Sequence, residues 1–438
     1  MTDRTRTLGV AGLGAGLLAA VYGWHEVADL GVDSGRFLVL GAAVLAACAG
    51  ATALLWRGAR RRDLIIVLGV AVAARALLAF DMPTLSDDVY RFIWDGRVQA
   101  EGINPYDFAP PAPELDGLRD FEVFSQLNRP FIRSAYPPAN QLVFVAVNVA
   151  AGEGASEIKG AFLLAEGLTL GLLLVVLARA GVPRGRVALY AWHPLAISEI
   201  SHAGHPEPLL MALTLLALLA WSARRPVGAG LALGAAVLTK LVPLLLGPFM
   251  LRRLGWRFAA ASVAGALVLF APYAGAGSRA LGSLGDYGDE RYGSGLYHWL
   301  TSAGLGHTPA QVLLGLALVT GVAWSAWRPP GDLVGACRVS ALLLGGAVVA
   351  SFNVQPWYLL WALPLLCVVP VPALLWACAT VPLYYGAIAP DPFISEDATS
   401  AIVWGPTVAL LAAEALRGRR SPRPAAGQPP VPVPSGSD

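Results

Sequence analysis

Residues 63–102 read DLIIVLGVAVAARALLAFDMPTLSDDVYRFIWDGRVQAEG, an apolar run that passes directly into a charged segment with helical spacing. The first twenty of these residues form a segment that is long and apolar enough to cross a hydrocarbon core of about 30 Å as a helix. Within 86–102, apolar residues share one helical face, while Asp88, Arg91 and Asp95 share another. This pattern is typical of an amphipathic helix in the membrane interface. The stretch therefore predicts a spanning helix that leads into an interfacial helix.

The composition of the whole chain also indicates a membrane protein. Of the 438 residues, 56% are apolar and only 14% are charged, and the mean hydropathy is +0.59. These values exclude an ordinary soluble enzyme. The net charge of +2 is much smaller than the excess of basic residues in nucleic-acid-binding proteins, so we expect no nucleic-acid partner. About fourteen apolar runs predict an all-α polytopic membrane protein with about 13–14 transmembrane helices.

Basic residues beside short loops set the expected orientation in the bilayer. If arginine clusters such as 57–62 and 179–186 are cytoplasmic, both termini are cytoplasmic and residues 83–157 lie outside, with 83–135 as a long outer loop. This outer loop is long and rich in aromatic residues, so we expect it to be structured. Residues 136–151 are apolar enough to cross, but a crossing would place 179–186 outside. We therefore predict that 136–151 is re-entrant or interfacial.

Two adjacent carboxylates, Asp87 and Asp88, begin the predicted interfacial helix after the possible N-cap Ser86. Acidic residues in a first turn complement the helix dipole, which contributes about 0.3–1 kcal/mol. A second interpretation is that one carboxylate accepts a proton from a hydroxyl nucleophile while the other orients it. Both interpretations stay open on these residues alone, because the second needs other groups to converge.

Two basic residues lie within apolar runs. Arg75 is expected about 12 Å below the outer end of its span at 1.5 Å per residue, where it either snorkels or binds an anion. Lys240 interrupts an apolar stretch between Arg225 and Arg252 that is too short for two full spans. Two short segments are therefore expected to meet near Lys240, with its ammonium at the outer end of a helical hairpin. The alternative is a single span with a buried lysine.

The stretch SEISHAGHPEP, residues 198–208, joins two predicted spans at the outer face and brings together Glu199, His202, His205 and Glu207. Its spacing matches no strong metal motif, so a divalent metal is possible but is not predicted. Hydrogen bonding to a polar ligand and a plain polar connector both remain open.

Two further outer clusters are rich in aromatic residues, GDYGDERYGSGLYHWL at 285–300 and FNVQPWYLLWALPL at 352–365. Such residues are expected in any interfacial belt, and they are also possible ligand contacts. The candidates for ligand contact in these clusters are Arg291, Tyr292, His298, Gln355, Trp357 and Tyr358.

Five stretches carry a resemblance to a known group when they are taken together. They are LSDDVYRFIWDGRVQAEGINPYDFAP (85–110), SAYPPANQLVF (134–144), LYAWHPLAISEISHAGHPEPL (189–209), LTKLVPLLLGPF (238–249) and QPWYLLWALPL (355–365). The chain resembles bacterial GT-C glycosyltransferases over roughly 63–410, and most of all actinobacterial polyprenol-phosphate-mannose-dependent α-mannosyltransferases. The most specific piece is the acidic pair followed by WDGR and GINPY.

The resemblance implies a division of the chain into three parts. Residues 1–62 are two N-terminal transmembrane helices, which exceed the simplest GT-C pattern. Residues 63–417 are a GT-C-like transmembrane catalytic domain, with 83–135 as its extracytoplasmic catalytic loop. Residues 418–438, rich in Pro, Gly and Ser, are expected to be a disordered cytoplasmic tail.

The resemblance also implies roles for individual residues. Asp87 or Asp88 is the catalytic carboxylate. The resemblance maps contacts to the donor phosphate onto Lys240 and onto the turn that holds His202 and His205. Arg75 is a further expected phosphate contact, because of its position near the outer end of its span. Candidate substrate-binding residues are Arg91, Asp95, Tyr136, Glu207, Arg291, Tyr292, Gln355, Trp357 and Tyr358. Gln355 stands where relatives are expected to carry a histidine, which weakens the case for a phosphate contact at that position.

The expected function is inverting transfer of a sugar, with mannose as the expected sugar, from a polyprenyl-phosphate carrier to a hydroxyl of a lipid-linked or cell-envelope glycan. An outward-facing site has no access to cytoplasmic nucleotide sugars, which favours a lipid-linked donor. The expected partners are the bilayer, this donor and a glycan or glycolipid acceptor, and no cofactor is expected. The alternatives are a secondary transporter or flippase, with intramembrane groups such as Glu166 as gates, and a lipid-binding scaffold without catalysis.

Overall fold

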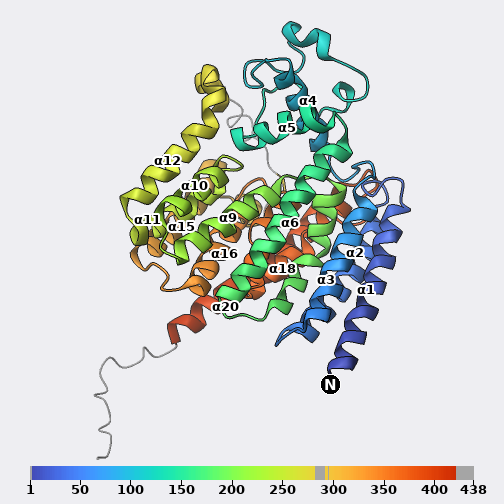
Figure 1. Cartoon of the computed structure of the whole chain (residues 1–438), viewed down its shortest axis with the longest axis vertical. Helices are drawn as coiled ribbons and strands as arrows, with labels where there is room; N and C mark the ends of the chain where they lie inside the picture. The colour runs from blue at the N-terminus through green and yellow to red at the C-terminus, as the bar shows by residue number, and fades with distance from the viewer. Residues whose placement is uncertain (1, 282–291, 294, 421–438) are drawn as a thin grey trace, which may run out of the picture.

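In the computed structural model, the protein is a bundle of long helices with a smaller cap at one end (Figure 1). The cap is formed by residues 85–151, which include α4 and α5. The structure describes residues 2–281, 292–293 and 295–420, so Arg291 and residues 421–438 lie outside the described part. The α-helices are α1 (Asp3–His25), α2 (Ser34–Leu55), α3 (Arg61–Leu78), α4 (Asp88–Ala100), α5 (Pro138–Ala151), α6 (Ala155–Arg179), α7 (Ala188–Ala191), α8 (Pro194–Ala196), α9 (Glu207–Ser222), α10 (Pro226–Val237), α11 (Gly247–Leu254), α12 (Trp256–Phe270), α14 (Leu296–Ser302), α15 (His307–Trp327), α16 (Leu333–Val349), α17 (Leu363–Leu366), α18 (Pro372–Thr380), α19 (Leu383–Ile388) and α20 (Glu396–Arg420).

Shorter helical turns connect these elements. The 3-10 turns are η1 (Pro113–Leu118), η2 (Phe124–Gln126), η3 (Arg184–Val187), η5 (Val242–Leu246), η6 (Ala271–Leu281) and η7 (Pro356–Trp361), and η4 (Ile197–His202) is a π-helix. Across the described residues there is no β-strand, only one isolated bridge between Tyr292 and Asn353.

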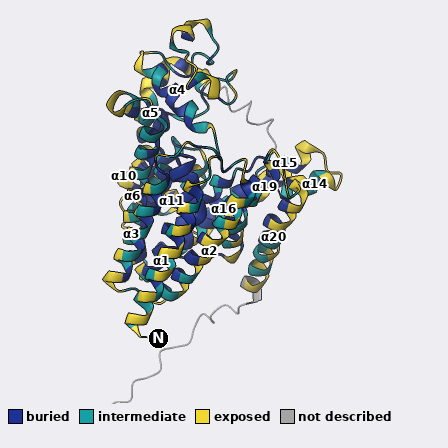
Figure 2. Cartoon of the chain, turned by 90° about the vertical axis from the view of Figure 1, so that its right-hand side faces the viewer, coloured by how far each residue is buried: buried dark blue, intermediate teal, exposed yellow. Residues whose placement is uncertain are grey.

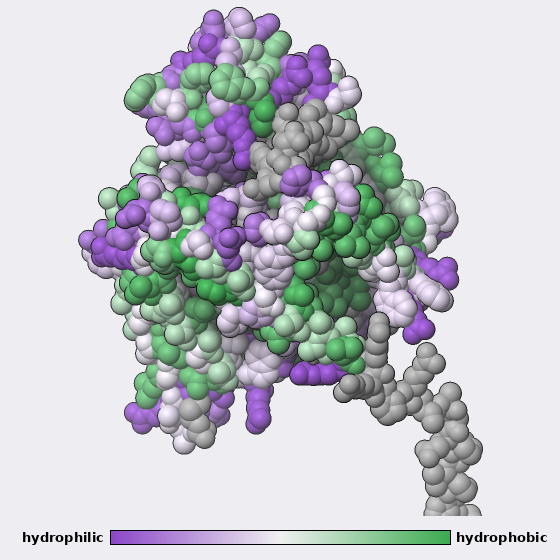
Figure 3. Space-filling view, turned by 180° about the vertical axis from the view of Figure 1, so that it is seen from behind, coloured by the Kyte–Doolittle hydropathy of each residue, from purple (hydrophilic) through white to green (hydrophobic). Residues whose placement is uncertain are grey.

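Six helices of the described part are long and apolar enough to cross a membrane: α1, α2, α6, α12 continued through η6 to Ala280, α15 and α20. Shorter apolar helices, α9, α10, α16 and α18 among them, complete the bundle. Figure 3 shows hydrophobic side chains over the bundle and hydrophilic ones gathered on the cap. The prediction of an all-α polytopic membrane protein is therefore confirmed.

Several spans expected as single helices are broken into short pieces. The chain from 187 to 202 forms η3, α7, α8 and η4 in succession. At Lys240 the apolar stretch breaks as predicted, because α10 ends at Val237 and η5 begins at Val242. Lys240 therefore lies in a connector and not inside a continuous span.

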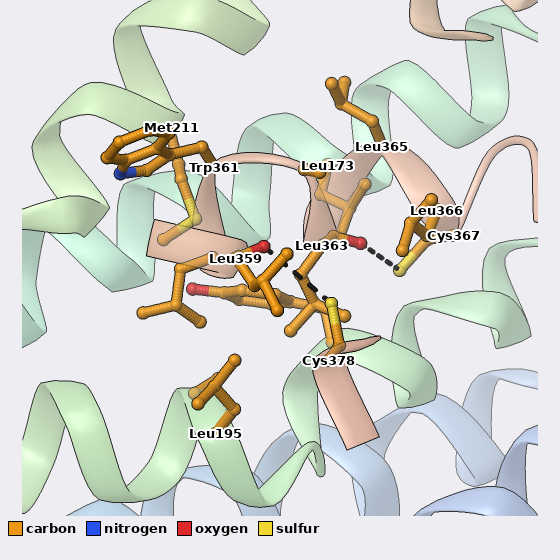
Figure 4. Packing of buried hydrophobic residues seen from close by; sticks show 14 of the residues in the cluster. Leu173, Leu195, Met211, Leu359, Trp361, Leu363, Leu365, Leu366, Cys367 and Cys378 are labelled. Carbon is orange, nitrogen blue, oxygen red and sulfur yellow. Dashed lines mark hydrogen bonds between the residues drawn. The ribbon is translucent and has the colours of Figure 1, made fainter. Parts of the chain in front are cut away.

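Close packing of small and large apolar side chains holds the bundle together. At the crossing of α10 with α12, a Cβ on Gly230 would lie 2.4 Å from the Phe258 carbonyl oxygen, and one on Gly234 would lie 2.3 Å from that of Ser262. Only glycine permits this approach, as in small-xxx-small packing between membrane helices. Figure 4 shows Met211, Leu359 and Leu363 interlocked in the main core.

The cap has a core of its own. Phe92 of α4 stacks on Phe144 of α5 with ring centroids 4.8 Å apart, and Tyr136 and Phe162 meet Phe92 edge-on. Helix α5 has 14 residues, about 21 Å at 1.5 Å per residue, which is too short to span a bilayer core. It packs against α4 and α6, in line with the prediction that 136–151 does not cross.

One expectation about α4 is wrong. The charged face predicted to meet the interface is covered, since Arg91 is only 4% exposed and Asp95 only 1% exposed. Arg91 pairs with Asp95 at 3.0 Å, and the Asp95 carboxylate accepts hydrogen bonds from Ser134 and Gln141. The following segment folds over this face, so α4 is buried on both sides.

The two ends of the described chain lie at the end of the bundle opposite the cap (Figure 1). Helix α20 continues to Arg420, three residues into the stretch expected to be a tail. Helix α1 packs against both α2 and α3, and the buried residues of α1 and α2 belong to the same core cluster as the rest of the bundle.

Candidate active site

A cavity of about 480 Å³ lies between the cap and the adjoining end of the bundle. The cap contributes 85–88, 128–129, 135–137 and 140 to its walls, and the bundle contributes 205–207, 210, 239–242, 292, 353, 355–358, 361, 385 and 388. Segments that are far apart in the sequence therefore enclose one space.

Asp87 and Asp88 lie together on the cap side of this cavity. Asp87 is the N-cap of α4 and Asp88 its first residue. The side-chain amide of Asn128 donates to both carboxylates, at 2.6 Å to Asp87 and 2.8 Å to Asp88. Desolvation among the cavity walls raises the pKa of Asp87, and the neighbouring Asp88 charge adds to this, while the Asn128 hydrogen bond opposes it. A carboxylate with a raised pKa is a stronger base for a hydroxyl proton.

His205 stands in the wall next to this pair. Its Nε2 lies 3.9 Å from an Asp88 carboxylate oxygen, and its ring stacks on Trp357 at 3.7 Å between centroids. On the other side, Nδ1 lies 3.2 Å from the Glu199 carboxylate, which also accepts from the Tyr385 hydroxyl at 3.0 Å. The Glu199 carboxylate therefore orients the imidazole and leaves Nε2 for the cavity.

Lys240 supplies a cation at the bundle side of the cavity. Its ammonium donates to Glu207 at 2.7 Å and lies 4.4 Å from the centre of the Tyr358 ring and 5.1 Å from that of Trp361. The lysine side chain is 32% exposed, whereas Glu207 is only 1% exposed. The ammonium is thus held in place and still faces the cavity.

Four polar atoms of the cavity-lining residues are buried without a hydrogen-bond partner among the described residues. They are Asn140 Oδ1, His205 Nε2, Glu207 Oε2 and the Tyr292 hydroxyl. Buried polar atoms are normally hydrogen-bonded, so such a concentration in one cavity is typical of a site for a polar ligand.

The structure brings many of the predicted site residues into this one cavity. They are Asp87, Asp88, Tyr136, His205, Glu207, Lys240, Tyr292, Gln355, Trp357 and Tyr358.

Four other predicted contacts do not line the cavity, because each is committed to a buried partner. Arg75 forms a two-pronged pair with Glu166 at 2.7 and 3.1 Å and also donates to the Ala191 carbonyl. His202 accepts from the Thr84 backbone N–H. Arg91 and Asp95 bind each other inside the cap, as described above. The predicted contacts of these four with substrate are therefore corrected. Arg291 lies outside the described residues.

Sequence reasoning missed Asn128, Arg129, Asn140, Thr239, Asn353, Trp361 and Tyr385 as cavity residues. Asn140 lies within the PPAN motif quoted above and was open to inference. Asn128 follows η2 in irregular chain, so no periodicity points to it.

The described residues contain no group of three or more His, Cys, Asp or Glu side chains arranged to hold a metal ion. The expectation that the protein needs no divalent metal stays a prediction.

The described residues form a helical membrane bundle with a cap, and its polar cavity holds paired carboxylates and a cation. These features define a polytopic membrane protein with a site for a polar ligand. Residues 5–255 match the family described as "Alpha-(1->6)-mannopyranosyltransferase, N-terminal domain", the MptA_B family. The match covers more than half of the 438 residues, and the chain belongs to this family. No curated protein matches the chain.

The family assignment makes the protein a membrane mannosyltransferase, which confirms the resemblance found in the sequence. The matched region contains Asp87, Asp88, His205, Glu207 and Lys240. The remaining wall of the cavity, from Tyr292 onward, lies beyond it.

Proposed function

We propose that the protein transfers mannose from a polyprenyl-phosphate carrier to a hydroxyl of a lipid-linked or cell-envelope glycan, with a GT-C-type mechanism and inversion at the anomeric carbon. The observation that carries this proposal is the presence of Asp87, Asp88 and Lys240 in the walls of one cavity. The family description supports mannose as the sugar and an α-(1→6) linkage as the product.

Asp87 is the proposed base. The acceptor oxygen attacks the anomeric carbon, its proton passes to the Asp87 carboxylate, and the bond from the anomeric carbon to the phosphate oxygen breaks. The electron pair leaves with the phosphate, whose growing charge is stabilised by Lys240 and by His205. Asp88 and Asn128 hold the base in position.

Phosphate is a competent leaving group, so the reaction needs no strong general acid. One displacement also needs no covalent glycosyl-enzyme and no cofactor, and we propose neither. A β-linked donor then gives an α-linked product.

We place the cavity on the extracytoplasmic face and both termini in the cytoplasm. Arginine clusters 57–62 and 179–186 lie at helix ends away from the cap, which supports this orientation by the positive-inside rule. Nucleotide sugars do not reach that face, so a carrier lipid is the proposed source of the sugar. The family assignment favours this function over a secondary transporter or flippase.

The experiment that tests the proposal is transfer by the purified protein in liposomes, with polyprenyl-phosphate mannose as donor and short α-mannosides as acceptors. The wild-type protein is expected to form an α-mannoside and to release polyprenyl phosphate. Transfer from a nucleotide sugar alone, or no transfer from the lipid donor to any mannoside, would contradict the proposal.

A further inference from the structure

We propose that a second, smaller cavity beside the first binds the acceptor glycan, at the sugar residue next to the one that carries the reacting hydroxyl. This inference rests on the proposed function and names where its acceptor is held. The second cavity has a volume of about 170 Å³, which is on the scale of a single hexose. Its walls come from α14, the start of α15, α19 and the start of α20, which lie together in Figure 2.

The two cavities share one residue, Tyr292, which lines both. Its backbone is fixed on the bundle, because its N–H donates to the Phe352 carbonyl at 3.3 Å and its carbonyl accepts from Val354 at 2.6 Å. The next residue, Gly293, has φ +63° and would place a Cβ 2.4 Å from the Val354 carbonyl oxygen, so only glycine fits. The two cavities therefore adjoin at Tyr292, and the proposal places the acceptor glycan across this residue.

Polar groups in the second cavity are available to a ligand. The Tyr292 hydroxyl is buried and has no hydrogen-bond partner among the described residues. A buried hydroxyl without a partner is costly unless a ligand completes it. Ser400, only 3% exposed, adds a second hydroxyl to the wall, where it interacts with the Tyr384 hydroxyl. These hydroxyls in one small cavity indicate a site for a hydroxyl-rich molecule.

The charges of the second cavity distinguish the acceptor from the donor. Glu396 and Asp397 are exposed at its rim, and Asp397 pairs with His298 at 2.9 Å. Carboxylates accept charge-assisted hydrogen bonds from sugar hydroxyls but repel a phosphate. The cation suited to the donor phosphate, Lys240, lines only the first cavity.

Aromatic side chains complete the site. Tyr297 and Tyr384 are both 2% exposed and lie in the wall of the second cavity. The Tyr297 hydroxyl is 2.7 Å from His307 Nδ1, which fixes the position of its ring. Aromatic rings with a polar tip offer a flat apolar face to a sugar ring and a hydrogen bond at its edge.

The test compares two acceptors in the full-length protein reconstituted in liposomes. Methyl α-mannoside fills only the reacting position, whereas α-1,6-linked methyl mannobioside extends into the second cavity. For the double variant Glu396→Gln with Asp397→Asn, we expect KM for the disaccharide to rise about tenfold, the effect of lost hydrogen bonds to charged groups. KM for methyl mannoside, KM for the donor and kcat are expected to stay within about twofold.

Asp391→Asn is the matched control, since Asp391 is an exposed carboxylate that lines neither cavity. Ser400→Ala should raise KM for the disaccharide in the same selective way. An equal rise for both acceptors, or no rise for the disaccharide, overturns the proposal.

A binding measurement separates this inference from the proposed function. Titration of methyl mannobioside without any donor, followed by intrinsic fluorescence, should saturate for the wild type and weaken about tenfold for the double variant. This result would stand even if the donor were not a polyprenyl-phosphate sugar. Absence of disaccharide binding by the wild type would overturn the acceptor site itself.

Discussion

Two buried carboxylates, Glu166 and Glu207, each hold a cation at 2.7 Å, and the difference between the two pairs separates structure from function in this protein. Glu166 and Arg75 satisfy each other inside the bundle, with the Tyr190 hydroxyl as a further donor to Glu166. Glu207 uses one oxygen for Lys240 and leaves the other without a partner among the described residues.

The two cations also differ in how far their side chains are exposed. Arg75 is 5% exposed, Glu166 is 1% exposed, and neither lines either cavity, so a ligand bound there does not reach them. Lys240 keeps 32% of its side chain exposed and faces the cavity. Both cations lie within apolar runs of the sequence. Only Lys240 faces a cavity, and only its carboxylate partner has an oxygen without a hydrogen bond, so Lys240 is the cation suited to a ligand.

The largest expected effect on stability comes from removing one partner of the buried pair of Arg75 and Glu166. Arg75→Met leaves Glu166 buried without its cation, and such a loss typically costs about 3–5 kcal/mol. We expect the free energy of unfolding in detergent to fall by about this amount. The loss should be smaller for Lys240→Met, because Glu207 lines the cavity and its charge can be solvated there. Thermal unfolding of the two variants, followed by circular dichroism, measures the difference.

Arg338→Met is the control for loss of an ordinary cation, because Arg338 pairs with Glu414 at 3.5 Å with half of its side chain exposed. The double variant Arg75→Met with Glu166→Leu should recover much of the lost stability, since no charge is then left unpaired. Equal melting temperatures for the Arg75→Met and Lys240→Met variants would refute the distinction between the pairs.

The opposite ranking is expected for catalysis. Lys240→Met should lower kcat for mannosyl transfer by about 100- to 1000-fold, the usual effect of losing one group that stabilises charge in a transition state. Initial rates with polyprenyl-phosphate mannose test this, with Arg338→Met again as control. A Lys240→Met enzyme with the kinetics of the wild type would remove the ammonium from the mechanism.

Loss of the hydrogen bond between Asn128 and the carboxylates is expected to have a smaller effect on the rate of transfer. Asn128 stabilises the charged form of Asp87, so Asn128→Ala should raise the pKa of Asp87 further. Because the base works only when ionised, activity is lost as the pH falls through this pKa, and the acidic limb should move to higher pH in the variant. At pH 8 the rate should fall by about tenfold or less, since Asp87 is ionised in both proteins.

The pH profile of kcat/KM, compared with that of the wild type, reports this shift. Asn148→Ala serves as a control amide, because Asn148 is in α5 and does not line the cavity. A limb that stays in place, or moves to lower pH, would show that Asn128 does not act on the base.

The fold was accessible from the sequence because apolar length and helical spacing are local properties. The start of α4 at Asp87 and Asp88, the break at Lys240 and the short helix after Pro137 all followed from nearby residues. Burial of the charged face of α4 did not follow, since it depends on the path of residues 103–135.

The site was only partly accessible for the same physical reason. A sequence shows that a buried cation needs a partner, but the partner of Arg75 lies 91 residues away at Glu166. His202 likewise commits to Thr84, 118 residues away. Asn128 reaches the carboxylates through irregular chain with no period. Residues near the cavity could be named from motifs, whereas the choice between a ligand and an internal partner required the three-dimensional structure.

The most direct test of the central claim is mannosyl transfer by Asp87→Asn and Asp88→Asn variants of the reconstituted protein, with polyprenyl-phosphate mannose and a mannoside acceptor. Asparagine keeps the size and the N-cap of α4 but is not a base, so we expect unchanged melting temperatures. For Asp87→Asn we expect a rate lower by about 100-fold or more. A folded Asp87→Asn enzyme that transfers mannose at the wild-type rate would contradict the assignment of this cavity as the place of catalysis.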